Sequence, residues 1–377
     1  MSMKSSKLKN KKHKNSIGKK IPNSVSLIII VSILLIFGSY MVFSASYIGV
    51  DDSPPWFYLL KHVFFIIAGI IFGTIFFKFS QLKHKSLLIY SFMALAIVLL
   101  LIAYIFGETI GGSKRWINLG PINIQPSELL KPALVLLVAH LLTRRKKANT
   151  GLAIFISFVA AGLVAVENLS SAILLIIPVV VIFFVYGINK KPAFIAGIIG
   201  VLGIVTAVIL APYRMLRIVN FMGVWLNPLK ADYQSKQSLY AIADGGIFGV
   251  GITNSKQKFF HLPEHHTDFI FAIVGEELGF IGAAILIILL FSLSFIIIQI
   301  ALETTDKFNK LAIIGFGALF VSQTILNLAV VTALSPVTGV TLPFISYGGS
   351  SIVSFLIIIG FILGTTVPKK RRKNEKQ

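Results

Sequence analysis

The stretch of sequence that decides the fold is residues 261–280, HLPEHHTDFIFAIVGEELGF, where a long polar segment ends and a long apolar run begins. Three histidines and four acids stand at this junction. Asp268 lies at the expected water–lipid edge, while Glu276 and Glu277 continue into the apolar run. A carboxylate at the centre of a membrane helix costs roughly 3 kcal/mol, so acids inside a span usually face a partner or a cavity. The sequence therefore places acid chemistry at one face of a membrane.

The composition is that of an integral membrane protein. The 377 residues are 56% hydrophobic and 13% charged, with a mean hydropathy of +0.87, and a soluble domain could not bury so much apolar surface. The absence of cysteine excludes disulfides, zinc–thiolate sites and thiol nucleophiles. No Walker A motif occurs, and the glycines of residues 246–251 lack a preceding strand, so neither an ATPase nor a dinucleotide site is expected.

We expect an all-α polytopic membrane protein with about ten transmembrane helices. The candidate spans cover residues 25–45, 56–77, 87–106, 127–142, 152–166, 172–186, 193–210, 269–300, 311–334 and 352–367. The eighth is too long for one upright helix and too short for two, so we expect one tilted helix there.

The charges predict how these spans are oriented. With a cytoplasmic N-terminus, the inner segments hold 25 of the 35 Lys and Arg residues but only three of the 14 acids, as the positive-inside rule requires. Both basic tails, residues 1–24 and 368–377, are then cytoplasmic, and attraction to anionic lipid explains them better than nucleic-acid binding. A single membrane domain covers residues 25–367. Its first span is expected to be a retained signal anchor.

Two outer loops are long enough to carry function, residues 107–126 and, between spans seven and eight, residues 213–267. The second includes RMLRIVNFMGVWLNP (214–228), a basic and aromatic run that predicts an interfacial or re-entrant helix. A third segment, SPVTGVTLPFISYGGSS (335–351), is too rich in Pro, Gly and hydroxyls for a lipid-facing helix. It should line a cavity or cap the bundle.

Candidate site residues begin in the first of these loops. Arg115 and Trp116 lie in it, and Glu128 and Lys131 follow at the head of the fourth span. A spacing of three places Glu128 and Lys131 on one helix face, where they form either a simple ion pair or part of a cationic cluster for an anionic head group.

The second loop offers further candidates. Lys256 and Lys258 are either a solvated loop face or cations that neutralise phosphate. Asp268 either complements the dipole of the following helix or acts as a general base. Glu276 lies about 80° around that helix from Asp268 and Glu277 nearly opposite, so one of the two is expected to pair with another helix. The histidines 261, 265 and 266 form only a weak metal pattern, and ordinary hydrogen-bonded interface histidines are the favoured interpretation.

These residues resemble a known family. Residues 111–131, 236–282 and 335–351 are similar to the SEDS proteins, the FtsW/RodA/SpoVE family of bacterial cell-wall polymerases, and the resemblance runs from the first span to the tenth. Residues 255–271 and 327–339 are most similar to the FtsW branch. The sequence departs from the family where Glu167-Asn168-Leu169-Ser170 replaces the usual Pro-Asp-Leu-Gly, so no role is carried onto Glu167.

The resemblance implies a glycosyltransferase that polymerises lipid II into β-1,4 glycan strands outside the bacterial cytoplasmic membrane, at the division septum. It implies a class B penicillin-binding protein, the transpeptidase, and other divisome membrane proteins as partners, with no nucleic acid. Asp268 is then the candidate base. Arg115, Lys131 and either Lys256 or Lys258 are the diphosphate candidates, with Mg²⁺ or Mn²⁺ as a candidate cofactor. Trp116, Glu128 and Glu276 complete the expected substrate-binding set.

Two other functions fit a chain of this kind. A lipid II flippase would also have many spans and intramembrane charge, but it needs polar groups along its whole path, and here they crowd the outer half. A non-catalytic divisome scaffold is disfavoured by the intact Asp268 segment.

Overall fold

The computed structural model describes residues 22–47, 54, 56–110, 113–120, 122–143, 149–188, 190–226, 232–258 and 262–367. Residues 1–21 of the N-terminal tail, the whole C-terminal tail and His261 lie outside this set. The described chain is almost entirely helical, with one small antiparallel sheet in the order β1-β2-β3. The helices are α1 (Asn23–Ala45), α2 (Trp56–Gln81), α3 (Ser86–Phe106), α4 (Pro126–Thr143), α5 (Thr150–Glu167), α6 (Leu169–Tyr186), α7 (Lys190–Ile209), α8 (Pro212–Leu226), α9 (Tyr233–Gly245), α10 (Ile270–Glu303), α11 (Lys307–Val331) and α12 (Gly349–Thr366). The strands are β1 (Glu108–Ile110), β2 (Ser113–Asn118) and β3 (Asn123–Ile124).

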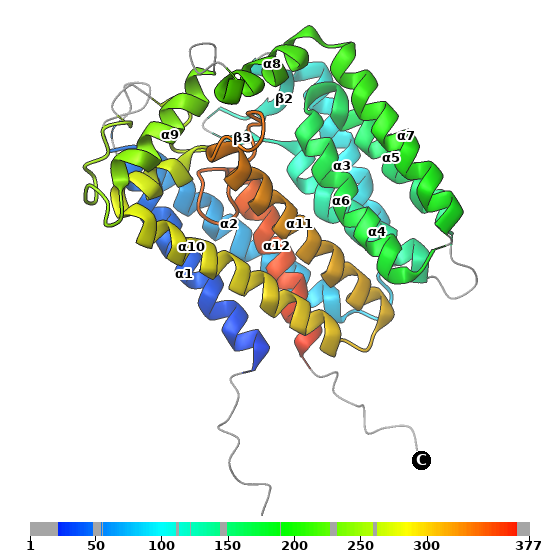
Figure 1. Cartoon of the computed structure of the whole chain (residues 1–377). Coiled ribbons are helices and arrows are strands. Elements are labelled where there is room, and N and C mark those ends of the chain that lie inside the picture. Colours follow the sequence, from blue (N-terminus) through cyan, green and yellow to red (C-terminus); the bar gives the residue numbers. More distant parts are fainter. Residues whose placement is uncertain are drawn as a thin grey trace, which may run out of the picture.

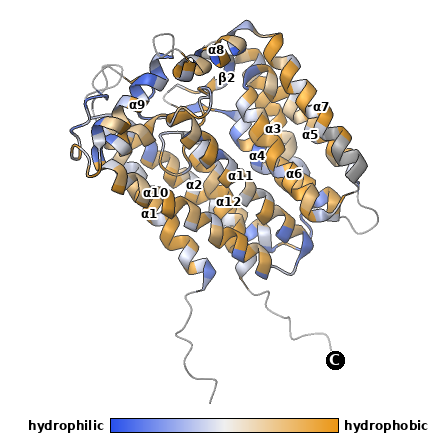
Figure 2. Ribbon diagram, in the orientation of Figure 1, coloured by the Kyte–Doolittle hydropathy of each residue, from blue (hydrophilic) through white to orange (hydrophobic). Residues whose placement is uncertain are grey.

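The number of membrane crossings agrees with the sequence. Nine described helices are long and apolar enough to span a membrane, and the pair formed by α7 and α8, bent by 94°, would be the tenth. The start of α1 and the end of α12 lie at the same end of the bundle (Figure 1), which requires an even number of crossings. The protein is thus a multi-pass membrane protein. Apolar residues run along the helices, and hydrophilic residues gather at their two ends (Figure 2).

The end of the bundle opposite to the two described chain ends carries α8, α9 and the strands (Figure 1). Helix α8 forms where the basic and aromatic run predicted one, and none of its residues is buried. Arg214 fixes the α7–α8 bend, because its guanidinium donates to the carbonyls of Ala165 and Val166 at the end of α5, at 2.6 and 2.8 Å, and to that of Ala207 at 3.0 Å.

The single span expected at 269–300 is found, as Ile270–Glu303, but its helix is not continuous. Helix α10 breaks at Gly279, where φ is 66° and ψ is −168°. The cause is the loop after α9, whose backbone enters the break: a Cβ on Gly279 would lie 2.3 Å from the amide nitrogen of Gly249. The Val250 and Gly251 amides donate to the carbonyls of Glu276 and Glu277 at 2.9 and 3.1 Å. A short buried helix, residues 270–278, therefore precedes the long remaining part of α10. Asp268 lies just before this short helix.

Candidate functional site

Asp268 and Arg115 meet at Gly339. Asp268 lies in the turn before α10, Arg115 lies in β2, and Gly339 belongs to the non-helical segment between α11 and α12. A Cβ on Gly339 would lie 3.6 Å from both Nη atoms of Arg115 and 3.6 Å from Oδ2 of Asp268. Gly339, whose φ is +68°, carries no side chain, so the space that a Cβ would occupy stays open to both groups. The candidate base and the candidate cation therefore border the same small space.

The surroundings of the Asp268 carboxyl group change its protonation equilibrium. Its pKa is raised from 3.8 to about 6, first by burial and then by the negative charge of Glu264. A hydrogen bond from Thr267 and the charge of Arg115 act in the opposite direction. A base with a pKa close to the working pH combines a large ionised fraction with a strong drive to accept a proton.

A second arginine and two further acids surround this pair. Burial and the charge of Arg217, in α8, lower the pKa of Arg115, while Asp268, Glu264 and Glu167 raise it. The carboxylate of Glu167 also accepts from the Lys114 amide of β2 at 2.7 Å, so the end of α5 is fastened to the strand that carries Arg115. Sequence reasoning missed Arg217 and Glu264, although Arg217 stands in the run that predicted α8.

Trp116 follows Arg115 in β2 and pairs with Glu108 across the sheet. Successive side chains of a strand point to opposite faces. The neighbours Arg115 and Trp116 are therefore on different faces of β2, and only Arg115 is placed against Asp268 and Gly339.

Glu128 and Lys131 form the intrahelical ion pair that their spacing allowed. The Lys131 Nζ lies 2.6 Å from Glu128 Oε1 and 2.8 Å from Gln323 Oε1 on α11, and Lys131 is 2% exposed. The Ser354 hydroxyl of α12 donates to the carbonyl of Glu128 at 2.8 Å. The pair thus joins α4, α11 and α12 inside the bundle, and the ammonium group is already engaged.

The two candidate lysines of the second loop, Lys256 and Lys258, differ in burial. Lys256 is exposed. Lys258 is buried, which corrects the solvated-face interpretation: its Nζ lies 2.9 Å from Glu277 Oε1. The Ser44 hydroxyl of α1 donates to the two Glu277 oxygens at 2.8 and 2.7 Å, so this acid does pair with another helix.

Glu276 is fully buried and faces the loop rather than an open cavity. Its carboxylate accepts from the Ser255 hydroxyl, from the Lys256 amide at 2.6 Å and from the Gln257 amide at 3.3 Å. The expected substrate contact by Glu276 is therefore replaced by a contact that holds residues 255–257 against the short helix.

Of the three histidines, His265 and His266 lie in the described part of the chain, and the expected hydrogen bond is found for His265, whereas the buried Nδ1 of His266 has no partner. The Nδ1 atom of His265 lies 2.7 Å from the carbonyl of Leu262, and burial lowers the pKa of His266 to about 3. The His266 ring packs against the rings of Tyr58 and Tyr347, with centroid-to-centroid distances of 4.7 and 5.9 Å. Within the described ranges, no three His, Cys, Asp or Glu side chains are grouped to hold a metal. The Mg²⁺ or Mn²⁺ expected from the resemblance stays a prediction.

The segment between α11 and α12 caps the bundle, as its composition predicted. Non-helical backbone inside a membrane protein needs partners for its polar groups, and here side chains of α8 and α11 supply them. The donors, with their acceptor carbonyls, are Trp225 to Ala333 at 3.1 Å, Arg217 to Val337 at 3.2 Å, Asn327 to Val340 at 2.7 Å and Gln323 to Thr341 at 3.1 Å.

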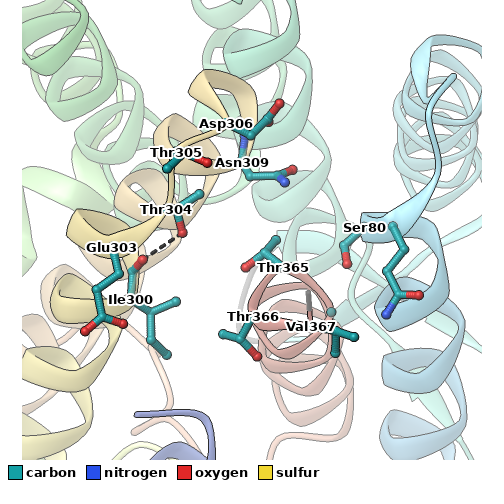
Figure 3. Close-up of a pocket in the computed structure, with 12 residues that line it drawn as sticks. Ser80, Ile300, Glu303, Thr304, Thr305, Asp306, Asn309, Thr365, Thr366 and Val367 are labelled. Atoms are coloured by element: carbon teal, nitrogen blue, oxygen red, sulfur yellow. Dashed lines mark hydrogen bonds between the residues drawn. The ribbon is translucent and has the colours of Figure 1, made fainter. Parts of the chain in front are cut away.

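A cavity of about 440 Å³ lies at the other end of the bundle (Figure 3). It is lined by the ends of α2, α10 and α12 and the start of α11, including Glu303, Asp306, Asn309 and several threonines. Asp268 precedes the first residue of α10 and Glu303 is its last, so the helix separates this cavity from the Asp268 site.

Comparisons with known proteins give the relatives of the chain. The model of the FtsW/RodA/SpoVE family, described as cell cycle protein, matches residues 25–371. Stage V sporulation protein E of Bacillus subtilis (strain 168) is 37% identical over 363 residues, which cover 92% of this chain and 98% of that protein. A probable peptidoglycan glycosyltransferase FtsW of Thiomicrospira cyclica is 36% identical over 356 residues, 90% of each chain. Among solved structures, a chain from a study of how a peptidoglycan synthase complex coordinates polymerisation and crosslinking is similar, with 26% identity and a TM-score of 0.69 over 90% of this chain and 96% of that one.

Proposed function

The chain belongs to the FtsW/RodA/SpoVE family of cell cycle proteins, and from this membership we propose that it polymerises lipid II into β-1,4 glycan strands at the outer face of the cytoplasmic membrane. It is a peptidoglycan glycosyltransferase, as relatives that cover most of its length are named. The observation that carries the mechanism is the meeting of Asp268 and Arg115 at Gly339.

The chemistry asks for one base and a diphosphate-binding group. The acceptor is the 4-hydroxyl of one lipid II, and the donor is a second lipid II whose sugar is α-linked to a polyprenyl diphosphate. The Asp268 carboxylate takes the hydroxyl proton while the oxygen attacks the anomeric carbon and the bond to the diphosphate breaks. The bonding electrons leave with the diphosphate, and one inversion turns the α-linkage into a β-linkage.

The cations of the site determine where the diphosphate is held. Lys131 and Lys258 are buried and already paired. We therefore assign the leaving diphosphate to Arg115 and Arg217, with exposed Lys256 at the rim of the outer face. Guanidinium groups suit this role because they bind phosphate oxygens in a bidentate manner and stay charged. Their positive charge stabilises the negative charge that develops on the leaving group.

We infer the biological setting from the family. A relative of known structure comes from a peptidoglycan synthase complex that coordinates polymerisation with crosslinking. By analogy, this chain works with a class B penicillin-binding protein and other divisome membrane proteins. The same analogy places the protein in the bacterial cytoplasmic membrane at the division septum.

The experiment supplies purified lipid II to the full chain together with its cognate transpeptidase and resolves glycan strands by length. A second arm follows the movement of labelled lipid II across vesicles that contain the same complex. Glycan strands from the complex support the proposal. Translocation of lipid II without glycan strands would favour a flippase. The absence of both activities would favour a non-catalytic scaffold.

A further inference from the structure

The amide of Asn327 joins the two segments that form the site. Its Nδ2 donates to the carbonyl of Asp268 at 2.8 Å and to the carbonyl of Val340 at 2.7 Å. The residue lies on α11 and is 0% exposed. A side-chain amide has two N–H donors, so both are committed to these two carbonyls.

These two carbonyls have particular places in the chain. One belongs to Asp268, whose carboxylate reaches the space at Gly339, and the other belongs to Val340, which directly follows Gly339. One planar amide therefore holds the backbone of the residue that carries the candidate base and also the backbone next to Gly339, beside which Arg115 and Asp268 both lie. Neither carbonyl lies inside a helix or strand, so no regular backbone ladder would hold this spacing in place of Asn327.

The remaining contacts show why one amide matters here. Tyr347 donates its amide to the carbonyl of His266 at 3.0 Å, which joins the same two segments at a second point. That point lies at the far end of the capping segment, away from Gly339. Without Asn327, the two segments would still be joined there, but the backbone of Asp268 would lose its link to the backbone beside Gly339.

We propose that Asn327 is a positioning residue for glycosyl transfer, whose amide sets the separation between the Asp268 carboxylate and the Arg115 guanidinium. The inference rests on the proposed function, and it assigns Asn327 no contact with lipid II. Reaction rates are sensitive to such placement, since a misplacement of about 1 Å can cost roughly 10²-fold in rate. The effect should therefore appear in kcat, with KM for lipid II little changed.

Two variants at the site and one control test the proposal. Asn327→Asp keeps the shape of the side chain but replaces the donor group with an acceptor oxygen. Asn327→Leu removes the donors without adding charge, and it serves if the carboxylate variant does not fold. Asn309→Asp is the matched control, because Asn309 is also a buried asparagine of α11 but lies at the opposite end, where its Oδ1 accepts from Lys85 at 2.9 Å.

Steady-state polymerisation of lipid II is measured for each variant in the transpeptidase complex. We expect either Asn327 variant to lose roughly 10²-fold in kcat, with KM within about twofold of wild type, and Asn309→Asp to match wild type. A wild-type kcat in a folded Asn327 variant overturns the proposal. So does a rise in KM at constant kcat, which would make Asn327 a substrate contact.

Hydrogen exchange gives a readout that does not need activity. Faster exchange confined to residues 262–269 and 335–347 in the Asn327 variants supports the inference. Unchanged exchange, or faster exchange throughout the bundle, overturns it. If wild type makes no polymer, the proposed function fails, and the exchange data still decide whether Asn327 fixes these two segments.

Discussion

The ammonium group of Lys258 lies 2.9 Å from Oε1 of Glu277, and neither side chain has any exposed surface. The pair connects the loop before Asp268 to the short helix after it, and Ser44 brings in α1. Removing one partner of a buried ion pair lowers the free energy of unfolding by about 3–5 kcal/mol, because the other charge stays buried without a partner. This loss is much larger than the net stabilisation that the intact pair provides. This contact therefore fixes the frame in which Asp268 is held.

Lys258→Met should lower the free energy of unfolding by about 3–5 kcal/mol, because it leaves the Glu277 carboxylate buried beside one hydroxyl. Unfolding in detergent measures the change, and Lys256→Met is the matched control because Lys256 is exposed. Adding Glu277→Leu to Lys258→Met should restore part of the loss. Equal stability of the two lysine variants would show that the buried pair does not contribute.

Gly339→Ala should lower both stability and kcat. A φ of +68° disfavours any residue with a Cβ by about 1–2 kcal/mol, and the new methyl group would enter the space between Arg115 and Asp268. Gly187→Ala is the control, since Gly187 has a φ of +80° with nothing within 4 Å of the added Cβ. We expect the two variants to melt alike, with only Gly339→Ala slow in polymerisation. Comparable activity in both would remove Gly339 from the site.

Lys131→Met distinguishes an internal ion pair from a diphosphate ligand. The structure predicts a loss of about 3 kcal/mol in stability, because Glu128 would stay buried without its cation. KM for lipid II should stay close to that of wild type once the variant is folded. A large rise in KM with unchanged stability would return Lys131 to the diphosphate site.

Activity should rise with pH through about 6. The base must be unprotonated, and the pKa of Asp268 is raised to about 6, so kcat/KM falls as the solution becomes more acidic than this value. Glu264 contributes to the raised pKa, and Glu264→Gln should therefore move the midpoint to lower pH. The pH profile of kcat/KM at constant ionic strength measures both effects. A midpoint that stays in place, or moves to higher pH, would contradict the electrostatic account.

Much of the fold could be read from the sequence because a bilayer imposes long apolar helices with basic residues on one side. The break in α10 could not, since the apolar pattern of residues 269–300 is the same for a straight helix and a broken one. The break arises from close backbone contact between Gly279 and Gly249. A contact of this kind leaves no trace in the periodicity of apolar residues along the sequence. The capping segment was predicted correctly, because its Pro, Gly and hydroxyl content excludes a lipid-facing helix.

The site was predicted in part. Asp268 and Arg115 were singled out one at a time, but their meeting at Gly339 depends on three segments that lie far apart in the chain. Local spacing did predict the Glu128–Lys131 pair, which lies within one helical turn. It could not distinguish exposed Lys256 from buried Lys258, whose partner Glu277 lies 19 residues further on. Asn327 begins the stretch 327–339 that resembles the family, but it was assigned no role, because an asparagine in an apolar helix does not reveal which carbonyls it meets.

The most direct test of the account compares wild type with Asp268→Asn in the transpeptidase complex, by the initial rate of glycan-strand formation from lipid II at neutral pH. Asparagine keeps the size of the side chain but cannot accept the proton, so we predict a fall of about 10²–10⁴-fold, with an unchanged melting temperature. Strand formation at the wild-type rate by folded Asp268→Asn would contradict the assignment of Asp268 as the base.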